Sequence, residues 1–277
     1  MDHKLPEIKV VPIKDLIFHE TEDPKRTKRL EERIMSDGYL KNPVIVGRVK
    51  HDDSKLLLLD GMHRVSALRN LGFSDVVAQV VDYFNKDVKI DAWCHLICDV
   101  NAQDLLARIR KIGNVSTTKT SRERATRMLQ QKKVVCCLFF KNKDVLAVRS
   151  RGDLKTRVSK LGEVVNLYYG CSNVKRGSEM ENVFLLEEHE TATALVIPPV
   201  YAKKEIVSLA SNGTRLPSGV TRHIILMRVL GFRVDLGLLK LGMPVEEKNT
   251  LVQQMLGYRI ANGKTRLYRE SVLIFDD

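Results

Sequence analysis

The sequence predicts a mixed fold, α/β or α+β, built from two domains. The first observation is the order of predicted elements, strand–helix–strand–strand–helix–strand, within about the first eighty residues, which is typical of a small α/β unit. The second is the length of 277 residues, 44% of them hydrophobic, because such a chain has room for about two domains with cores of their own. We therefore expect domains at residues 1–100 and 101–240, followed by a C-terminal extension at 241–277.

The first unit is organised around residues 56–59, four consecutive leucines that predict a strand buried on both faces. Asp60-Gly61 ends this strand, and apolar residues at helical spacing then predict a helix. His63 and Arg64 therefore fall at a strand-to-helix turn, where free N–H groups and the helix dipole attract anions. The unit is completed by strands at 8–13, 43–49 and 75–81, a loop at 16–24 and a helix at 25–35.

The rest of the chain predicts a second mixed region. Apolar runs at 134–140 and 145–148, joined by a polar turn, predict a hairpin. Residues 164–169 are compatible with a helix or a strand, and residues 265–275 predict one or two strands. The remaining predicted helices are 103–111, 121–131, 154–161, 202–210 and 246–257.

Composition limits the class of protein. The net charge of +12 suits nucleic acid, anionic metabolites such as nucleotides, or a solvated basic surface. No apolar run approaches the ~20 residues that span a bilayer, and the polar N-terminus lacks a signal peptide, so we expect a cytoplasmic protein without a membrane partner. Five cysteines, an odd number without a secretory signal, predict buried reduced thiols and no disulfide framework.

The familiar catalytic signatures are missing from the sequence. It contains no G-x4-GK[ST] loop, no G-x-G-x-x-G after a strand, no H-E-x-x-H and no G-x-S-x-G. This argues against a P-loop NTPase, a Rossmann dehydrogenase and a serine hydrolase.

Three short segments carry the available chemistry. His19-Glu20 is either a site where a carboxylate takes a proton from a hydroxyl or simply part of a solvated acidic loop. The turn at residues 60–64 is either an anion site or an ordinary connection between a strand and a helix. The third segment combines a hydroxyl, a guanidinium fork and an imidazole, as an anion clamp or a basic surface loop would: Thr221, Arg222 and His223.

Taken together, these segments resemble the ParB/sulfiredoxin-like superfamily, and within it the free L-serine kinases. Leu59-Asp60-Gly61-Met62-His63-Arg64 is similar to the family's D-G-x-H-R signature. The resemblance covers roughly residues 5–240. Its further members, in chain order, are His19-Glu20, Asn42-Pro43, Asp82-Tyr83-Phe84, Asp87-Val88-Lys89, Trp93, Leu167-Tyr168-Tyr169-Gly170 and Thr221-Arg222-His223.

The resemblance implies a function for each segment. It implies a ParB/sulfiredoxin-like N-terminal domain that binds nucleotide and phosphate, a second α/β domain that contributes a substrate clamp, and phosphoryl transfer to free L-serine. Glu20 would be the catalytic base. The nucleotide and phosphate site would comprise Asp60, Gly61, Met62, His63 and Arg64, and the serine site His19, Trp93, Thr221, Arg222 and His223.

The same resemblance implies cofactors and a product. The donor would be ATP, or ADP as in an archaeal relative, with Mg²⁺ bridging its phosphates and Asp60 as the candidate metal contact through water. The product, O-phospho-L-serine, would supply 2,3-diaminopropionate for a siderophore. A homodimer is compatible with this function.

One position departs from the related motifs. Sulfiredoxins carry a cysteine where this chain has Met62, so their thiol chemistry is excluded. Archaeal serine kinases carry D-G-H-H-R, so Met62 removes one histidine and leaves only its backbone N–H for phosphate.

A ParB-like DNA-binding regulator is the alternative function. Residues 104–133 are rich in arginine and lysine, and two short predicted helices around Gly113 faintly resemble a helix-turn-helix. The apolar spacing of such a unit is poorly developed there, which favours the kinase.

Overall fold

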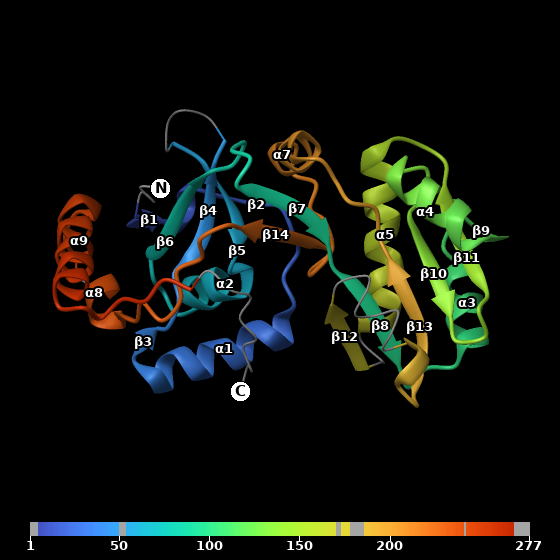
Figure 1. The fold of residues 1–277 in the computed structure, drawn as a ribbon, viewed down its shortest axis with the longest axis horizontal. Coiled ribbons are helices and arrows are strands. Elements are labelled where there is room, and N and C mark those ends of the chain that lie inside the picture. The colour runs from blue at the N-terminus through green and yellow to red at the C-terminus, as the bar shows by residue number, and fades with distance from the viewer. Residues whose placement is uncertain (1–4, 50–53, 170–172, 178–185, 241, 269–277) are drawn as a thin grey trace.

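The computed structural model describes residues 5–49, 54–169, 173–177, 186–240 and 242–268. Its architecture is mixed α/β, with two main sheets placed side by side along the long axis of the molecule (Figure 1). The predicted fold class is therefore confirmed. Within these ranges, no helix is long and apolar enough to cross a membrane.

The first sheet has five strands in the order β1-β6-β4-β5-β2. The three-residue β2 lies in the stretch predicted as a loop, and it forms because Ile17 pairs in parallel register with the distant Leu57 of β5. The bounds are β1 (Glu7–Pro12), β2 (Leu16–Phe18), β4 (Val44–Arg48), β5 (Leu56–Asp60) and β6 (Asp75–Asp82).

Two helices beside this sheet carry residues of the later site. Helix α1 (Pro24–Asp37) begins at Asp23, whose side chain accepts hydrogen bonds from two N–H groups of the first turn, and ends at Gly38 with φ +72°. Helix α2 (Met62–Asn70) packs against α1 and follows β5 directly. Its N-terminus is at Gly61, whose φ of +100° strongly favours glycine. The predicted strand, turn and helix around residue 60 are all confirmed.

The second sheet has six strands, each antiparallel to its neighbours, in the order β12-β8-β13-β10-β11-β9. Helix α5 (Leu154–Tyr169) packs on it, so residues 164–169, which were compatible with a helix or a strand, are helical. The bounds of the strands are β8 (Cys94–Cys98), β9 (Val115–Thr120), β10 (Cys136–Phe140), β11 (Val145–Ser150), β12 (Asn173–Gly177) and β13 (Ala192–Ile197).

The two short helices predicted on either side of Gly113 are confirmed, but they do not form the helix-turn-helix of the alternative function. Strand β9 separates helix α3 (Ala102–Arg110) from helix α4 (Arg122–Gln130) and pairs with β11 along its whole length. The segment between the helices is therefore part of a sheet, because its residues find hydrogen-bond partners more than twenty residues further along the chain.

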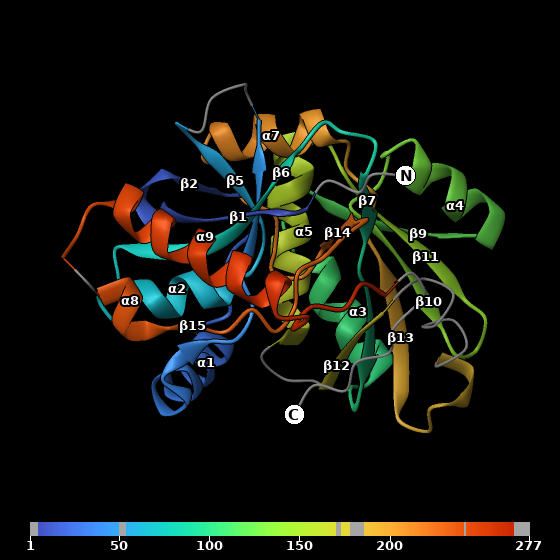
Figure 2. The same ribbon diagram turned by 60° about the vertical axis from the view of Figure 1, so that its left-hand side comes forward.

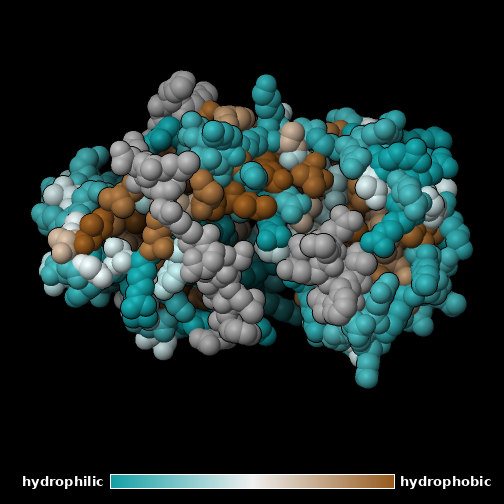
Figure 3. All heavy atoms as spheres, in the orientation of Figure 1, coloured by the Kyte–Doolittle hydropathy of each residue, from teal (hydrophilic) through white to brown (hydrophobic). Residues whose placement is uncertain are grey.

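A two-stranded ribbon joins the two halves. Strand β7 (Val88–Ala92) leads out of the first half, and β14 (Thr221–Ile225) returns antiparallel to it after helix α7 (Lys203–Ser211). Figure 3 shows apolar side chains gathered over this ribbon, and exposed hydrophobic residues along it include Ile224.

The last described elements lie on the first half. Strand β15 (Val234–Asp235) pairs with β3 (Tyr39–Leu40), and α8 (Leu236–Lys240) and α9 (Val245–Ala261) follow. Helix α9 lies against β1 (Figures 1 and 2). Of the strands predicted at 265–275, residues 265–268 form none, and 269–277 lie outside the described residues.

The described cysteines are buried free thiols, as predicted: Cys94, Cys98, Cys136 and Cys137. Burial raises the pKa of the Cys137 thiol to about 12, so this group is an apolar core side chain at neutral pH. Cys171 lies outside the described residues.

Candidate active site

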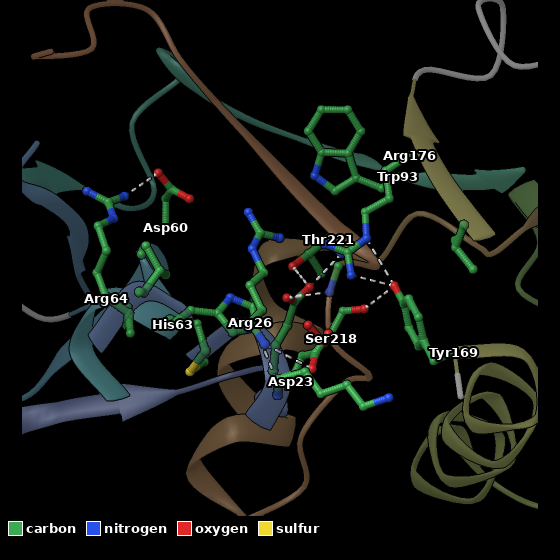
Figure 4. Close-up of a pocket in the computed structure, with 18 of the residues that line it drawn as sticks. Asp23, Arg26, Asp60, His63, Arg64, Trp93, Tyr169, Arg176, Ser218 and Thr221 are labelled. Carbon is green, nitrogen blue, oxygen red and sulfur yellow. Dashed lines mark hydrogen bonds and ion pairs between the residues drawn. The ribbon is translucent and has the colours of Figure 1, made fainter. Parts of the chain in front are cut away.

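A cavity of about 990 Å³ lies where the two halves meet (Figure 4). Its walls come from α1, the β5–α2 turn, the segment after β2, the end of α5, β12 and the loop before β14. Two of the three segments singled out in the sequence, His19-Glu20 and the turn at 60–64, meet around this space together with Thr221 of the third, although they are separated by up to two hundred residues. Arg222 and His223 do not line it. That space is large enough for a nucleotide-sized ligand.

Glu20 lies at the centre of a dense hydrogen-bond network. Its Oε2 accepts the N–H of Gly219 at 2.9 Å, and its Oε1 accepts the N–H of Val220 at 3.2 Å and of Thr221 at 2.7 Å. The Thr221 hydroxyl also donates to Oε1. The neighbouring backbone holds this arrangement, because Leu216 exchanges hydrogen bonds with the chain on both sides of Glu20.

The side chains beside Glu20 form a buried polar cluster. His19 Nε2 lies 2.8 Å from the Thr221 hydroxyl, and the His19 ring stands edge-on to His223 at 5.1 Å between centroids. The Tyr83 hydroxyl lies 3.2 Å from His223 Nε2. Burial lowers the pKa of His19 and lowers that of His223 to about 3, so both rings are neutral at physiological pH.

The β5–α2 turn lines the opposite part of the cavity. His63 Nε2 accepts the N–H of Asp23 at 3.1 Å, and burial, followed by the charge of Arg26, lowers the pKa of His63 to about 4. Met62 is buried in the core of the first half while its backbone opens the helix. The first N–H groups of α2 therefore lie at the cavity wall.

Asp60 and Arg64 bind each other and the surrounding chain. Arg64 donates to Asp60 Oδ2 at 3.0 Å and to the carbonyls of Asn42 and Pro43 at 2.8 and 2.7 Å. Arg228 donates to the same Asp60 oxygen at 3.0 Å. These guanidinium groups outweigh burial and hold the pKa of Asp60 below its ordinary value, so the carboxylate is charged.

Trp93 and Arg222 form a stacked pair at the start of the ribbon. The Arg222 guanidinium lies 4.5 Å from the centroid of the Trp93 ring, and 3.9 Å separates it from the Asp91 carboxylate. Trp93 lines the cavity, and its backbone N–H donates to the carbonyl of Val220 at 2.9 Å. Arg222 reaches this site from the face of β14 opposite to Thr221, because side chains alternate along a strand.

Several cavity residues escaped the sequence reasoning. Arg26 reaches the cavity from α1, and Arg176 reaches it from β12 (Figure 4). Arg29 of α1 also lines it. Arg176 donates to the Tyr169 hydroxyl at 2.7 Å, and this hydroxyl donates to the carbonyl of Ser218 at 3.0 Å. The basic character of residues 25–33 was visible in the sequence, but nothing in it indicated which charges face inward.

The geometry defines a class of protein: an α/β protein in which the cavity between the two halves is lined by a helix N-terminus, by arginines and by a carboxylate that holds a hydroxyl. No family model matches the chain. It is 25% identical over 276 residues to the ATP-dependent L-serine kinase SbnI of Staphylococcus aureus, covering 100% of both chains. It is 28% identical to the ATP-dependent L-serine kinase of Staphylothermus marinus, over 78% of this chain and 84% of that one.

The fold is shared with a solved structure. A free serine kinase in complex with AMP superposes with a TM-score of 0.70 at 18% identity, covering 88% of this chain and 94% of that one. The resemblance to free L-serine kinases that the ordered motifs predicted is thus confirmed over the whole chain.

Proposed function

We propose that this protein transfers a phosphoryl group from ATP to the hydroxyl of free L-serine, giving O-phospho-L-serine, and that it acts in the cytoplasm. One observation carries the proposal: Glu20 holds the Thr221 hydroxyl inside a cavity that arginines and a helix N-terminus also line. The likeness to kinases named for L-serine and ATP, which covers the full length of one of them, supports the same reaction and the same donor.

Glu20 is the proposed catalytic base. A carboxylate oxygen can accept two hydrogen bonds, and Oε2 accepts one from Gly219, which leaves a lone pair for the serine hydroxyl. The serine oxygen attacks the terminal phosphorus, its proton passes to Glu20, and the nucleoside diphosphate leaves with the bridging oxygen. Thr221 contacts this carboxylate, His19 contacts Thr221, and His223 packs against His19, so these side chains would line the serine site. Trp93 with Arg222 would form its outer wall.

The phosphates of the donor are proposed to lie at the β5–α2 turn. The N–H groups that open α2 at Gly61, Met62 and His63 face the cavity wall, and Arg26 and Arg176 add positive charge. Asp60 and Arg64 contribute to this site by holding the turn against Asn42-Pro43. Positioning and charge stabilisation of this kind supply most of the catalysis in phosphoryl transfer.

Mg²⁺ is proposed to enter as part of the nucleotide substrate. Among the described residues, no group of three or more His, Cys, Asp or Glu side chains could hold a metal ion. A metal that is bound mainly by phosphate oxygens and water needs only one or two carboxylates, and charged Asp60 at the cavity wall fits this requirement through a bridging water.

Two further roles follow from the proposed reaction. The first half, with the β5–α2 turn, would provide the nucleotide site, and the second half, with β14, would complete the serine site. The phosphoserine product would supply a siderophore precursor of the 2,3-diaminopropionate type.

The test of this function is the Glu20→Gln variant assayed for phosphoserine by mass spectrometry, with serine and either ATP or ADP. Glutamine keeps the size of the side chain but is a very weak base, so we expect kcat to fall by roughly 10²–10⁴-fold. Lys14→Gln is the control for turnover, because Lys14 is exposed and does not line the cavity. Near wild-type turnover in Glu20→Gln would show that another group accepts the proton.

A further inference from the structure

The loop that presents its N–H groups to Glu20, residues 216–220, is held from the opposite side by the second half of the molecule. The carbonyl of Gly219 lies 2.7 Å from His95 Nε2, and the carbonyl of Ser218 accepts the Tyr169 hydroxyl at 3.0 Å. His95 belongs to β8 of the second sheet, and Tyr169 belongs to helix α5, which packs on that sheet. Glu20 itself comes from the first half.

His95 has one orientation in this network. It is 1% exposed, and its Nδ1 lies 2.7 Å from the hydroxyl of the fully buried Tyr168. Burial lowers the pKa of His95 to about 4, so the ring is neutral near pH 7 and carries a single N–H. Since a carbonyl can only accept, that hydrogen is on Nε2 and donates to Gly219, while Nδ1 accepts from Tyr168.

The contact with His95 and one of the contacts with Glu20 belong to the same peptide unit. The carbonyl of Gly219 and the N–H of Val220 lie in the same plane, because the peptide bond between them is rigid. The carbonyl accepts from His95, and the N–H donates to Glu20 Oε1. The orientation that His95 gives to this plane therefore fixes one donor to the Glu20 carboxylate, and hydrogen bonds in such a chain reinforce each other.

The loop has little freedom to take another shape at this point. Gly219 has φ +71°, and a Cβ there would lie 2.4 Å from Arg176 Cζ. Arg176 is itself held by two hydrogen bonds to the Tyr169 hydroxyl. The peptide plane is thus enclosed between Glu20 on one side and His95, Tyr169 and Arg176 on the other.

We infer that His95, oriented by Tyr168, is a positioning residue for the reaction: through the Gly219–Val220 peptide it fixes the Glu20 carboxylate that accepts the serine proton. This rests on the proposed function. It gives a role to the Tyr168-Tyr169 pair, which belongs to one of the motifs of the family resemblance but had no function assigned from the sequence. It also explains how the second half of the molecule acts on a base that belongs to the first.

The test compares His95→Leu with His95→Gln. Leucine removes the N–H that holds the Gly219 carbonyl, whereas the glutamine amide places a donor near the position of Nε2. We expect His95→Leu to lower kcat by roughly 10–100-fold, because a misplaced base costs that much, with the KM values for serine and ATP changed by less than about threefold. His95→Gln is expected to recover kcat to within about fivefold of the wild type.

Tyr168→Phe provides a second and milder variant in case His95→Leu does not fold. It removes only the hydroxyl that orients His95, and we expect kcat to fall by roughly 3–10-fold. Tyr201→Phe is the matched control, because Tyr201 is buried in the same core cluster. It should retain wild-type kcat and a melting temperature close to that of Tyr168→Phe.

A Glu20→Gln background separates the two proposals. If His95 acts through Glu20, then adding His95→Leu to Glu20→Gln causes no further loss of kcat. The positioning role would be overturned if the double variant lost kcat by the product of the two single losses. It would also be overturned if Tyr168→Phe had the same kcat as Tyr201→Phe. Absence of phosphoserine from the wild-type protein would instead overturn the proposed function.

Discussion

Neutral buried histidines are a recurring feature at the scale of single residues. His95 and His223 are both almost fully buried, and burial lowers their pKa values to about 4 and about 3. Each exchanges its hydrogen bonds with neutral groups of the protein, a tyrosine hydroxyl in both cases. The uncharged form is therefore the one that the folded protein stabilises.

This predicts a loss of stability on acidification. Below pH 6.5 the unfolded chain binds a proton at His95 that the folded protein does not bind until about pH 4, so the free energy of unfolding falls as the pH drops through this window. For His95 alone the loss between pH 7.5 and pH 5 is about 2 kcal/mol, at about 1.4 kcal/mol per pH unit. Urea denaturation at the two pH values measures it.

His95→Gln is the matched variant for this measurement, because glutamine does not titrate. The pH-dependent loss in the variant should be smaller than in the wild type by about the share assigned to His95. Equal losses in the two proteins would contradict the pKa direction.

Residue roles were only partly accessible from the sequence. The residue types at Glu20, at the 60–64 turn and at 221–223 indicated chemistry. The structure places Glu20, the turn and Thr221 around one cavity, with His223 beside His19 and Arg222 stacked on Trp93. Their assignment to base, phosphate site and serine site stays a prediction. Arg176 and His95 could not be found, because their importance depends on which loop of another element they touch, and no local pattern encodes that contact.

At the scale of elements, the β5–α2 turn depends on one glycine. A Cβ on Gly61 would lie 2.6 Å from Val44 Cγ1, in addition to the unfavourable φ of +100°. Gly72, at the other end of α2, has φ +82° but open space around it. The two positions therefore separate backbone strain from steric overlap.

We expect Gly61→Ala to lower the free energy of unfolding by about 2–5 kcal/mol, the sum of left-handed strain and overpacking. Gly72→Ala should lower the free energy of unfolding by about 1–2 kcal/mol, because only the left-handed backbone strain applies there. Urea unfolding of both variants tests the difference, and equal losses would mean that the turn relaxes around the new methyl group.

Elements with strong local patterns were predicted well, and elements made by distant pairing were not. The leucine strand and the helices with clear caps follow from residues within a few positions of each other. Strands β9 and β13 consist of mixed or small residues, and only their partners in the second sheet make them strands. The ambiguous residues 164–169 became helix because their apolar face packs in the core beneath the sheet.

At the scale of the whole molecule, the C-terminal helix is bound to the first sheet by a buried ion pair. Lys248 Nζ lies 2.7 Å from Asp75 Oδ2 and donates to the carbonyl of Leu239 at 2.9 Å, and both charged side chains are almost inaccessible. Asn249 exchanges hydrogen bonds with both backbone groups of Val10. Residues beyond the N-terminal unit thus complete its outer face.

The ion pair predicts an asymmetric response to mutation. Lys248→Met should lower the free energy of unfolding by about 3–5 kcal/mol, because it leaves the Asp75 carboxylate buried and unpaired. The double variant Asp75→Leu/Lys248→Met replaces both charges with apolar groups, so its free energy of unfolding should fall much less than that of Lys248→Met. Chemical denaturation measures both, and a double variant less stable than Lys248→Met would show that the charges contribute more than they cost.

The contact between α9 and β1 also has a consequence for biosynthesis. The chain is made from its N-terminus, so the strands of the first sheet leave the ribosome more than a hundred and fifty residues before the helix that covers β1. Until then Asp75 has no lysine partner and the backbone of Val10 lacks its asparagine. The first sheet can therefore reach its final packing only after residues 245–261 have been made, when the second half has already had time to fold as a unit.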